Sequence, residues 1–160
     1  MLQFCQWLDQ TAVGTAIRQS LWLFPAIETI HLLGMAALVA TITVLDLRLL
    51  GWTAKTQPIS KLAARLIPFA WLGFAVQVVT GVLLFSSEAV KIYGNPAFRL
   101  KLLLLLLAGV QALVFQTLTF KSLPSWDDQP SLPAVAKAMG AISILLWAAI
   151  VTAGRFIGFV

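Results

Sequence analysis

Four long apolar segments, separated by short polar ones, dominate the pattern of the chain. They cover residues 21–50, 61–87, 98–120 and 132–160. About 20 apolar residues are enough for a helix to cross the hydrocarbon core of a bilayer, and each segment is at least that long. The apolar runs are continuous rather than alternating, which favours helices over the strands of a membrane barrel. The pattern therefore predicts an all-α integral membrane protein.

The segments between the apolar runs are short and rich in turn residues. Residues 51–60, 88–96 and 124–131 contain the glycines, prolines and polar residues that are typical of loops. Short loops join antiparallel neighbours, so we expect one domain, residues 1–160, with four antiparallel transmembrane helices and both termini on the same side. Residues 1–20 interleave apolar and polar side chains, which predicts a short amphipathic surface helix that is broken near Gly14.

Composition and charge agree with a membrane protein. Hydrophobic residues make up 60% of the 160 residues and charged residues 11%, and the mean hydropathy is +0.93. The net charge of +5 is spread over loops and helix ends, so we expect the lipid bilayer, and no nucleic acid, as the partner of these charges. Lysine and arginine are slightly denser around residues 51–60, which favours a cytoplasmic position for that loop and the opposite side for both termini.

The first apolar segment carries three ionisable residues along one side. At about 100° per residue, Glu28 and Asp46 fall within a narrow stripe and His31 lies at its edge. Ionisable groups inside a membrane usually face protein or a water-filled cavity, where they serve function or packing. We therefore expect this stripe to face the interior of the bundle.

The last apolar segment repeats this spacing with basic residues. Lys137 and Arg155 are eighteen residues apart, as are Glu28 and Asp46, and eighteen residues make five helical turns. In antiparallel helices, Glu28 and Arg155 would share the outer side, and Asp46 and Lys137 the inner side. We expect the first and fourth helices to be neighbours, joined by a Glu28–Arg155 pair and, as a second candidate, by an Asp46–Lys137 pair. Asp46 has two rival partners near the same surface, Lys61 and Arg65.

His31 is the only histidine, and three interpretations of it stay open. In the first, Glu28, His31 and Arg155 form a buried polar network that fixes the packing. In the second, His31 is an axial ligand of haem b. Either this histidine alone holds the haem, or the haem is shared across a homodimer or with a partner subunit. In the third, Glu28 and His31 line a polar cavity for a proton path or the head of a quinone-like ligand. Neutral hydrogen-bond partners for that cavity would be Gln77, Thr80 and Gln111.

Other chemistries find little support in the sequence. Cys5 is the only cysteine, which excludes a disulfide, an iron–sulfur cluster and a thiolate zinc site within one chain. Phosphate-binding glycine loops, metalloprotease motifs and nucleophile elbows are absent from the sequence. We therefore expect no metal site and no catalytic residues.

Several blocks of sequence resemble a family of small bacterial inner-membrane proteins that carry an uncharacterised-function domain. These blocks are Trp22-Leu23-Phe24-Pro25 with Glu28 and His31, Leu45-Asp46-Leu47-Arg48-Leu49-Leu50-Gly51, Asn95-Pro96-Ala97-Phe98-Arg99-Leu100-Lys101 and Ala153-Gly154-Arg155-Phe156-Ile157. The resemblance covers nearly the whole chain and implies a four-helix protein of the bacterial inner membrane, without an established activity. A looser likeness, to copper-resistance proteins and b-type cytochrome subunits of membranes, rests on an apolar helix with a histidine.

These observations together predict a non-catalytic protein of the bacterial inner membrane with periplasmic termini. We expect it to work as a homo-oligomer or as an accessory subunit of a membrane complex, with Glu28, His31 and Arg155 as its intramembrane polar site. A b-type haem or quinone-linked electron-transfer subunit that uses His31 is the alternative.

Overall fold

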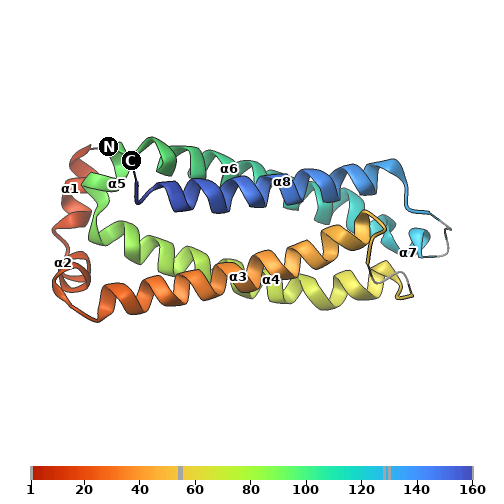
Figure 1. The fold of residues 1–160 in the computed structure, drawn as a ribbon, viewed down its shortest axis with the longest axis horizontal. Helices are drawn as coiled ribbons and strands as arrows, with labels where there is room; N and C mark the ends of the chain where they lie inside the picture. Colours follow the sequence, from red (N-terminus) through yellow and green to blue (C-terminus); the bar gives the residue numbers. More distant parts are fainter. Residues whose placement is uncertain (1, 54–55, 128, 130, 160) are drawn as a thin grey trace.

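Four long helices form an elongated bundle in the computed structural model, which describes residues 2–53, 56–127, 129 and 131–159. They are α3 (Leu23–Leu49), α4 (Ile59–Ser87), α6 (Pro96–Val114) and α8 (Ala134–Phe156), and the described residues contain no strand. Successive long helices run antiparallel, and both termini lie at the same end of the bundle (Figure 1). The predicted all-α fold and the four predicted spans are confirmed.

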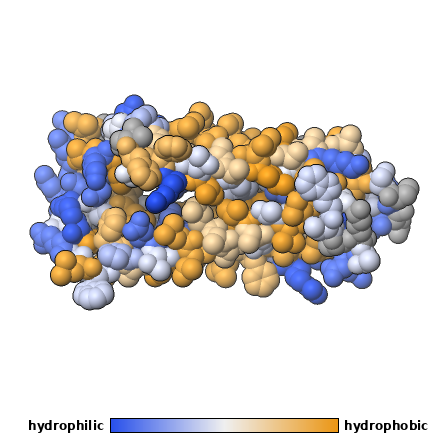
Figure 2. Space-filling model, in the orientation of Figure 1, coloured by the Kyte–Doolittle hydropathy of each residue, from blue (hydrophilic) through white to orange (hydrophobic). Residues whose placement is uncertain are grey.

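The surface of the bundle matches a membrane environment. Each span is long and apolar enough to cross a bilayer, including the continuous helical stretch Pro96–Trp126. The middle of the visible face is mostly hydrophobic, whereas hydrophilic residues gather toward its two ends (Figure 2). Only 6–22% of the residues in the most apolar window of each span are buried, so most apolar side chains of the spans face outward, as they do in a bundle that lipid surrounds.

The third span differs from its predicted extent, residues 98–120. After α6, the chain continues through a π-helical turn, Phe115–Thr119, a 3₁₀ turn, Phe120–Ser122, and the short helix α7 (Leu123–Trp126). The start of the predicted loop at residues 124–131 is therefore helical. Proline is compatible with the first turn of a helix, where its missing N–H would have no partner, and Pro124 occupies that position in α7.

The N-terminal segment forms two short helices, α1 (Leu2–Asp9) and α2 (Ala12–Gln19). The break lies before α2 rather than near Gly14, because the Thr11 hydroxyl accepts a hydrogen bond from the Gly14 N–H at 3.2 Å and caps α2. Gly14 lies inside α2, where a Cβ would collide with the Ser86 carbonyl oxygen of α4. This glycine therefore allows the surface helix to pack closely on the end of α4.

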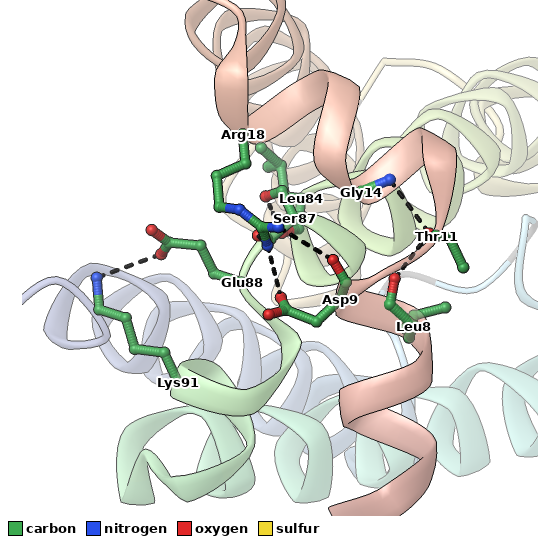
Figure 3. A network of polar contacts seen from close by, with 9 residues as sticks. All are labelled: Leu8, Asp9, Thr11, Gly14, Arg18, Leu84, Ser87, Glu88 and Lys91. Carbon is green, nitrogen blue, oxygen red and sulfur yellow. Dashed lines mark hydrogen bonds and ion pairs between the residues drawn. The ribbon is translucent and has the colours of Figure 1, made fainter.

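A small polar network fastens the surface helices to the bundle (Figure 3). The Arg18 guanidinium lies 3.0 Å from the Asp9 carboxylate and donates a 2.9 Å hydrogen bond to the carbonyl oxygen of Ser87, the last residue of α4. Beyond it, Lys91 of α5 (Ala89–Gly94) pairs with Glu88 at 3.3 Å. These contacts fix α1 and α2 at the end of the molecule where the termini lie.

The opposite end carries the hydrophobic core cluster and two helix caps. Leu49, Ile59, Ala63, Leu123, Leu132 and Ala136 form this core cluster. Gly51 ends α3 with a φ of +79°, a backbone conformation that glycine adopts without steric cost.

Asp127 accepts hydrogen bonds from the backbone N–H and the hydroxyl of Ser60, at the start of α4. Burial raises the pKa of Asp127, but the bonds from Ser60 and the nearby Arg48 charge outweigh it and lower that pKa.

Close backbone approach holds α3 against both α4 and α8. The prediction that the first and fourth membrane helices are neighbours is confirmed, because α3 packs on α8 as well as on α4. A Cβ on Gly140 of α8 would lie only 2.8 Å from the Asp46 carbonyl oxygen and 3.1 Å from the Leu49 Cβ. Small residues permit such close packing in lipid, where helices gain little from hydrophobic attraction to each other.

Gly140→Ala should destabilise the bundle because its new methyl group forces α3 and α8 apart. We expect a loss of about 1–3 kcal/mol, the usual effect of overpacking a tight contact. The matched control is Gly109→Ala on α6, where a Cβ meets no atom within 4 Å. Unfolding by dodecyl sulfate in mixed micelles, followed by circular dichroism, measures both. Equal stability of the two variants would contradict this account of the α3–α8 contact.

Candidate functional site

His31 lies in the third turn of α3 and contacts α4 through its ring. Its Nδ1 is 2.7 Å from the Thr80 hydroxyl oxygen, and that hydroxyl donates a 2.6 Å hydrogen bond to the Val76 carbonyl oxygen. A hydroxyl group has one hydrogen to donate, so the Thr80 oxygen must accept from His31. We therefore assign the proton of the neutral imidazole to Nδ1, which leaves the Nε2 lone pair available.

Gln77 and Gly81 of α4 complete the surroundings of His31. The Gln77 side-chain amide donates a 2.6 Å hydrogen bond to the His31 carbonyl oxygen. A Cβ on Gly81 would lie 3.5 Å from His31 Cε1, so this glycine places the helix backbone beside the ring. Gln77 and Thr80 thus contact His31, as the sequence suggested. Gln111 does not join them, because it donates to the Met139 carbonyl oxygen of α8 at 2.8 Å.

Lys101 is a residue of this site that sequence reasoning missed. It lies in the second turn of α6 and is partly buried. Its ammonium nitrogen would lie 3.3 Å from a Cβ on Gly154 of α8, so the side chain crosses between the two helices. Lys101 forms no ion pair within the described ranges. The available signal was a lysine immediately before the run Leu102–Leu107, inside a span rather than in a loop.

Glu28 and Arg155, the expected partners of His31, are both exposed on the bundle. The ion pairs within the described part of the chain are Asp9–Arg18 and Glu88–Lys91, so the expected Glu28–Arg155 pair is not formed inside one chain. Arg155 lies in the last turn of α8, and its guanidinium is 5.3 Å from the centre of the Phe159 ring. A long side chain at a helix end can extend toward the interface in this way.

The Asp46–Lys137 pair is not formed either. Asp46 is only 4% exposed and is adjacent to Ser143 of α8, whereas Lys137 is exposed in the first turn of that helix. Ser143 lies six residues beyond Lys137, which is about 9 Å along the helix axis. The Asp46 carboxylate is therefore placed too deep for the lysine, at a level that the sequence spacing alone did not reveal.

The fold and these residues define the class of the protein as a small, multi-pass helical membrane protein. No group of three or more histidine, cysteine, aspartate or glutamate residues that could hold a metal ion occurs among the residues with described positions. The chain belongs to the family of unknown function DUF6644, whose model matches residues 4–160, and the family resemblance is thereby confirmed. No curated protein and no solved structure matches the chain, and the looser likeness to copper-resistance and cytochrome subunits is not shown.

Thr80→Val should change the state of the His31 ring because it removes the oxygen that accepts from Nδ1. With a single histidine, ¹⁵N-histidine labelling gives one set of ring signals. We expect a protonated Nδ1 and an unprotonated Nε2 in the wild type, and a mixture of tautomers in Thr80→Val. Thr80→Ser is the control and should retain the wild-type spectrum. A wild-type spectrum with unprotonated Nδ1 would overturn the assignment.

Proposed function

We propose that the protein is a non-catalytic subunit of the bacterial inner membrane, with periplasmic termini, that works as a homo-oligomer or as an accessory subunit of a membrane complex. In this proposal, the polar site of Glu28, His31 and Arg155 lies at the contact with another chain. The observation that carries it is the position of Glu28. This carboxylate is in the second turn of the first span, faces outward, and has neither a hydrogen bond nor an ion pair with the described residues.

The cost of charge in lipid supports a contact between chains. A charged side chain at the centre of a membrane helix costs about 2.5–3.5 kcal/mol on insertion scales, and the cost decreases toward the ends. A basic group from a second chain would offset this cost for Glu28. Arg155 is an exposed arginine on the neighbouring helix α8, and it can serve the same role for a carboxylate of another copy.

The internal contacts of His31 support the same arrangement. Thr80 and Gln77 bind the ring and the backbone of His31 from α4, which fixes the imidazole relative to Glu28 one turn away. A rigid histidine beside an outward-facing carboxylate presents one hydrogen-bond acceptor and one negative charge to a partner. These two features suit a specific polar contact between membrane helices.

Site-specific photo-cross-linking tests this proposal in native membranes. With p-benzoylphenylalanine in place of Leu32, which is 52% exposed on α3 one turn from Glu28, we expect irradiation to give adducts whose mass exceeds the 17.4 kDa of one chain. Adducts at multiples of that mass indicate a homo-oligomer, and other masses indicate a different subunit. The control places the same group at Leu145, which is 70% exposed on α8, where we expect lipid and no protein adduct. Absence of protein adducts at position 32 would refute the proposal.

A b-type haem or quinone-linked electron-transfer subunit is the second candidate, and the available Nε2 of His31 favours it. Haem iron is commonly bound by a histidine nitrogen whose ring is oriented by a hydrogen bond from its other nitrogen. In this protein, Nδ1–H of His31 donates such a bond to the Thr80 hydroxyl oxygen. A haem on this single histidine would lie between chains, in agreement with the shared-ligand interpretation of the sequence.

Optical spectroscopy separates the two candidates. If His31 binds haem, the protein purified from a haem-sufficient bacterium should give a reduced-minus-oxidised b-type spectrum and a positive pyridine haemochrome assay. His31→Ala should lose both, whereas Thr80→Ser should keep both because its hydroxyl is retained. A wild-type protein without haem absorbance would exclude the haem version of this candidate.

A further inference from the structure

A half-open cavity of about 190 Å³ is lined by all four long helices, in the half of the bundle farther from the termini (Figure 1). Its walls are mainly apolar and include Ile67 and Phe74 of α4 and Leu105 and Ala112 of α6. The lining residues that are exposed on the surface of the bundle are all on α4 and α6, among them Trp71, Phe74 and Leu113. The cavity therefore opens toward the surrounding bilayer on the side of α4 and α6.

Asp46 places a carboxyl group without a complete set of partners in this apolar cavity. Its side chain is 4% exposed, lines the cavity, and has an Oδ2 atom without a hydrogen-bond partner in the described chain. Ser143 is its polar neighbour on α8. The close contact of Gly140 with the Asp46 backbone fixes the position of the residue. Buried oxygens of native proteins nearly always have a partner, so Oδ2 calls for a donor from outside the chain.

Water from the membrane surface cannot readily supply that donor. The core cluster of Leu49, Ile59, Leu123 and Leu132 lies at the loop end of the bundle, one turn beyond Asp46 along α3. Apolar side chains therefore separate the carboxyl group from that end. The open route to it leads from the lipid, on the side of α4 and α6.

The backbone of the third span is irregular at the same place. The π-helical turn Phe115–Thr119 contributes Phe115 and Gln116 to the cavity lining. Isolated π turns within α-helices occur frequently at functional sites, because the extra residue changes the direction of neighbouring side chains. This feature is independent of the unpartnered oxygen and marks the same cavity.

We propose that this cavity binds a lipid-soluble molecule with a ring-sized head that carries a hydrogen-bond donor. The donor binds Oδ2 of Asp46, the ring fills the apolar cavity, and any tail leaves on the side of α4 and α6. The volume is suitable, since an engineered apolar cavity of about 150 Å³ holds benzene. Asp46 lies fifteen residues from His31, about 22 Å along α3, so this site is separate from the polar site near the termini.

Two probes of matched size test the proposal with the full chain in lipid nanodiscs. They are 4-fluorobenzyl alcohol, which has a donor, and 4-fluorotoluene, which has none; ¹⁹F NMR measures saturable binding above partition into empty nanodiscs. We expect the alcohol to bind about tenfold more tightly than the toluene, as one additional buried hydrogen bond implies. Asp46→Leu should remove this preference by weakening only the alcohol.

A second variant keeps the test decisive if Asp46→Leu fails to fold. Gly109 lines the cavity and has free space at its Cβ position, so Gly109→Phe should fill the cavity and abolish binding of both probes. Leu106→Phe, at a lipid-facing position that is 64% exposed on the same helix, is the matched control and should bind both probes normally. Absence of saturable binding to the wild type, equal affinity for both probes, or full binding to Gly109→Phe would each overturn the proposal.

Discussion

Close backbone contact between α3 and its two neighbours is the constraint on which the rest of the structure depends. Lipid tails are as apolar as leucine, so membrane helices associate through tight packing and a few polar bonds rather than through hydrophobic attraction. Gly34 and Gly73 provide this packing between α3 and α4, and Gly140 provides it between α3 and α8. Each contact also positions a polar group, because Gly34 lies one turn from His31 and Gly140 lies beside Asp46.

This packing places polar groups at two levels, which are two different depths along the bundle axis. Near the termini, His31 binds Thr80 and Gln77, and Lys101 extends toward α8 at a similar depth. Near the loops, Asp46 is adjacent to Ser143. The two levels lie too far apart along the bundle to bind each other. The polar groups inside the membrane are therefore satisfied locally or by something outside the chain.

The sequence predicted the structural features that depend on hydropathy and on the helical period. The four spans and the α3–α8 contact were predicted correctly, since apolar length and the placement of charge are local properties of the sequence. The ion pairs were not, because a helical period gives the face of each helix but not the depth at which two helices meet. Gly140 sets that depth, and it places Asp46 opposite Ser143 rather than Lys137.

Two further predictions failed because the sequence was interpreted one residue at a time. Lys101 is one of the charges that were placed together at loops and helix ends from the sequence, whereas its long side chain lies between α6 and α8. Gly14 was interpreted as a helix break, whereas it serves the contact of α2 with α4. Both errors arise from tertiary contacts, which local sequence does not encode.

Side-chain length explains why the two ionisable residues of the interior that form no ion pair, Lys101 and Asp46, have different consequences. Lys101 lies in the second turn of α6, and its flexible four-carbon chain lets its ammonium group reach toward the end of α8, where headgroups and water are close. Asp46 has a short side chain, and the core cluster covers it on the side of the nearer membrane surface. A lysine can thus move its charge to the solvent, whereas this aspartate needs a donor that comes to it. The same bilayer physics therefore makes Lys101 compatible with the isolated chain and makes Asp46 the residue for which we propose a ligand.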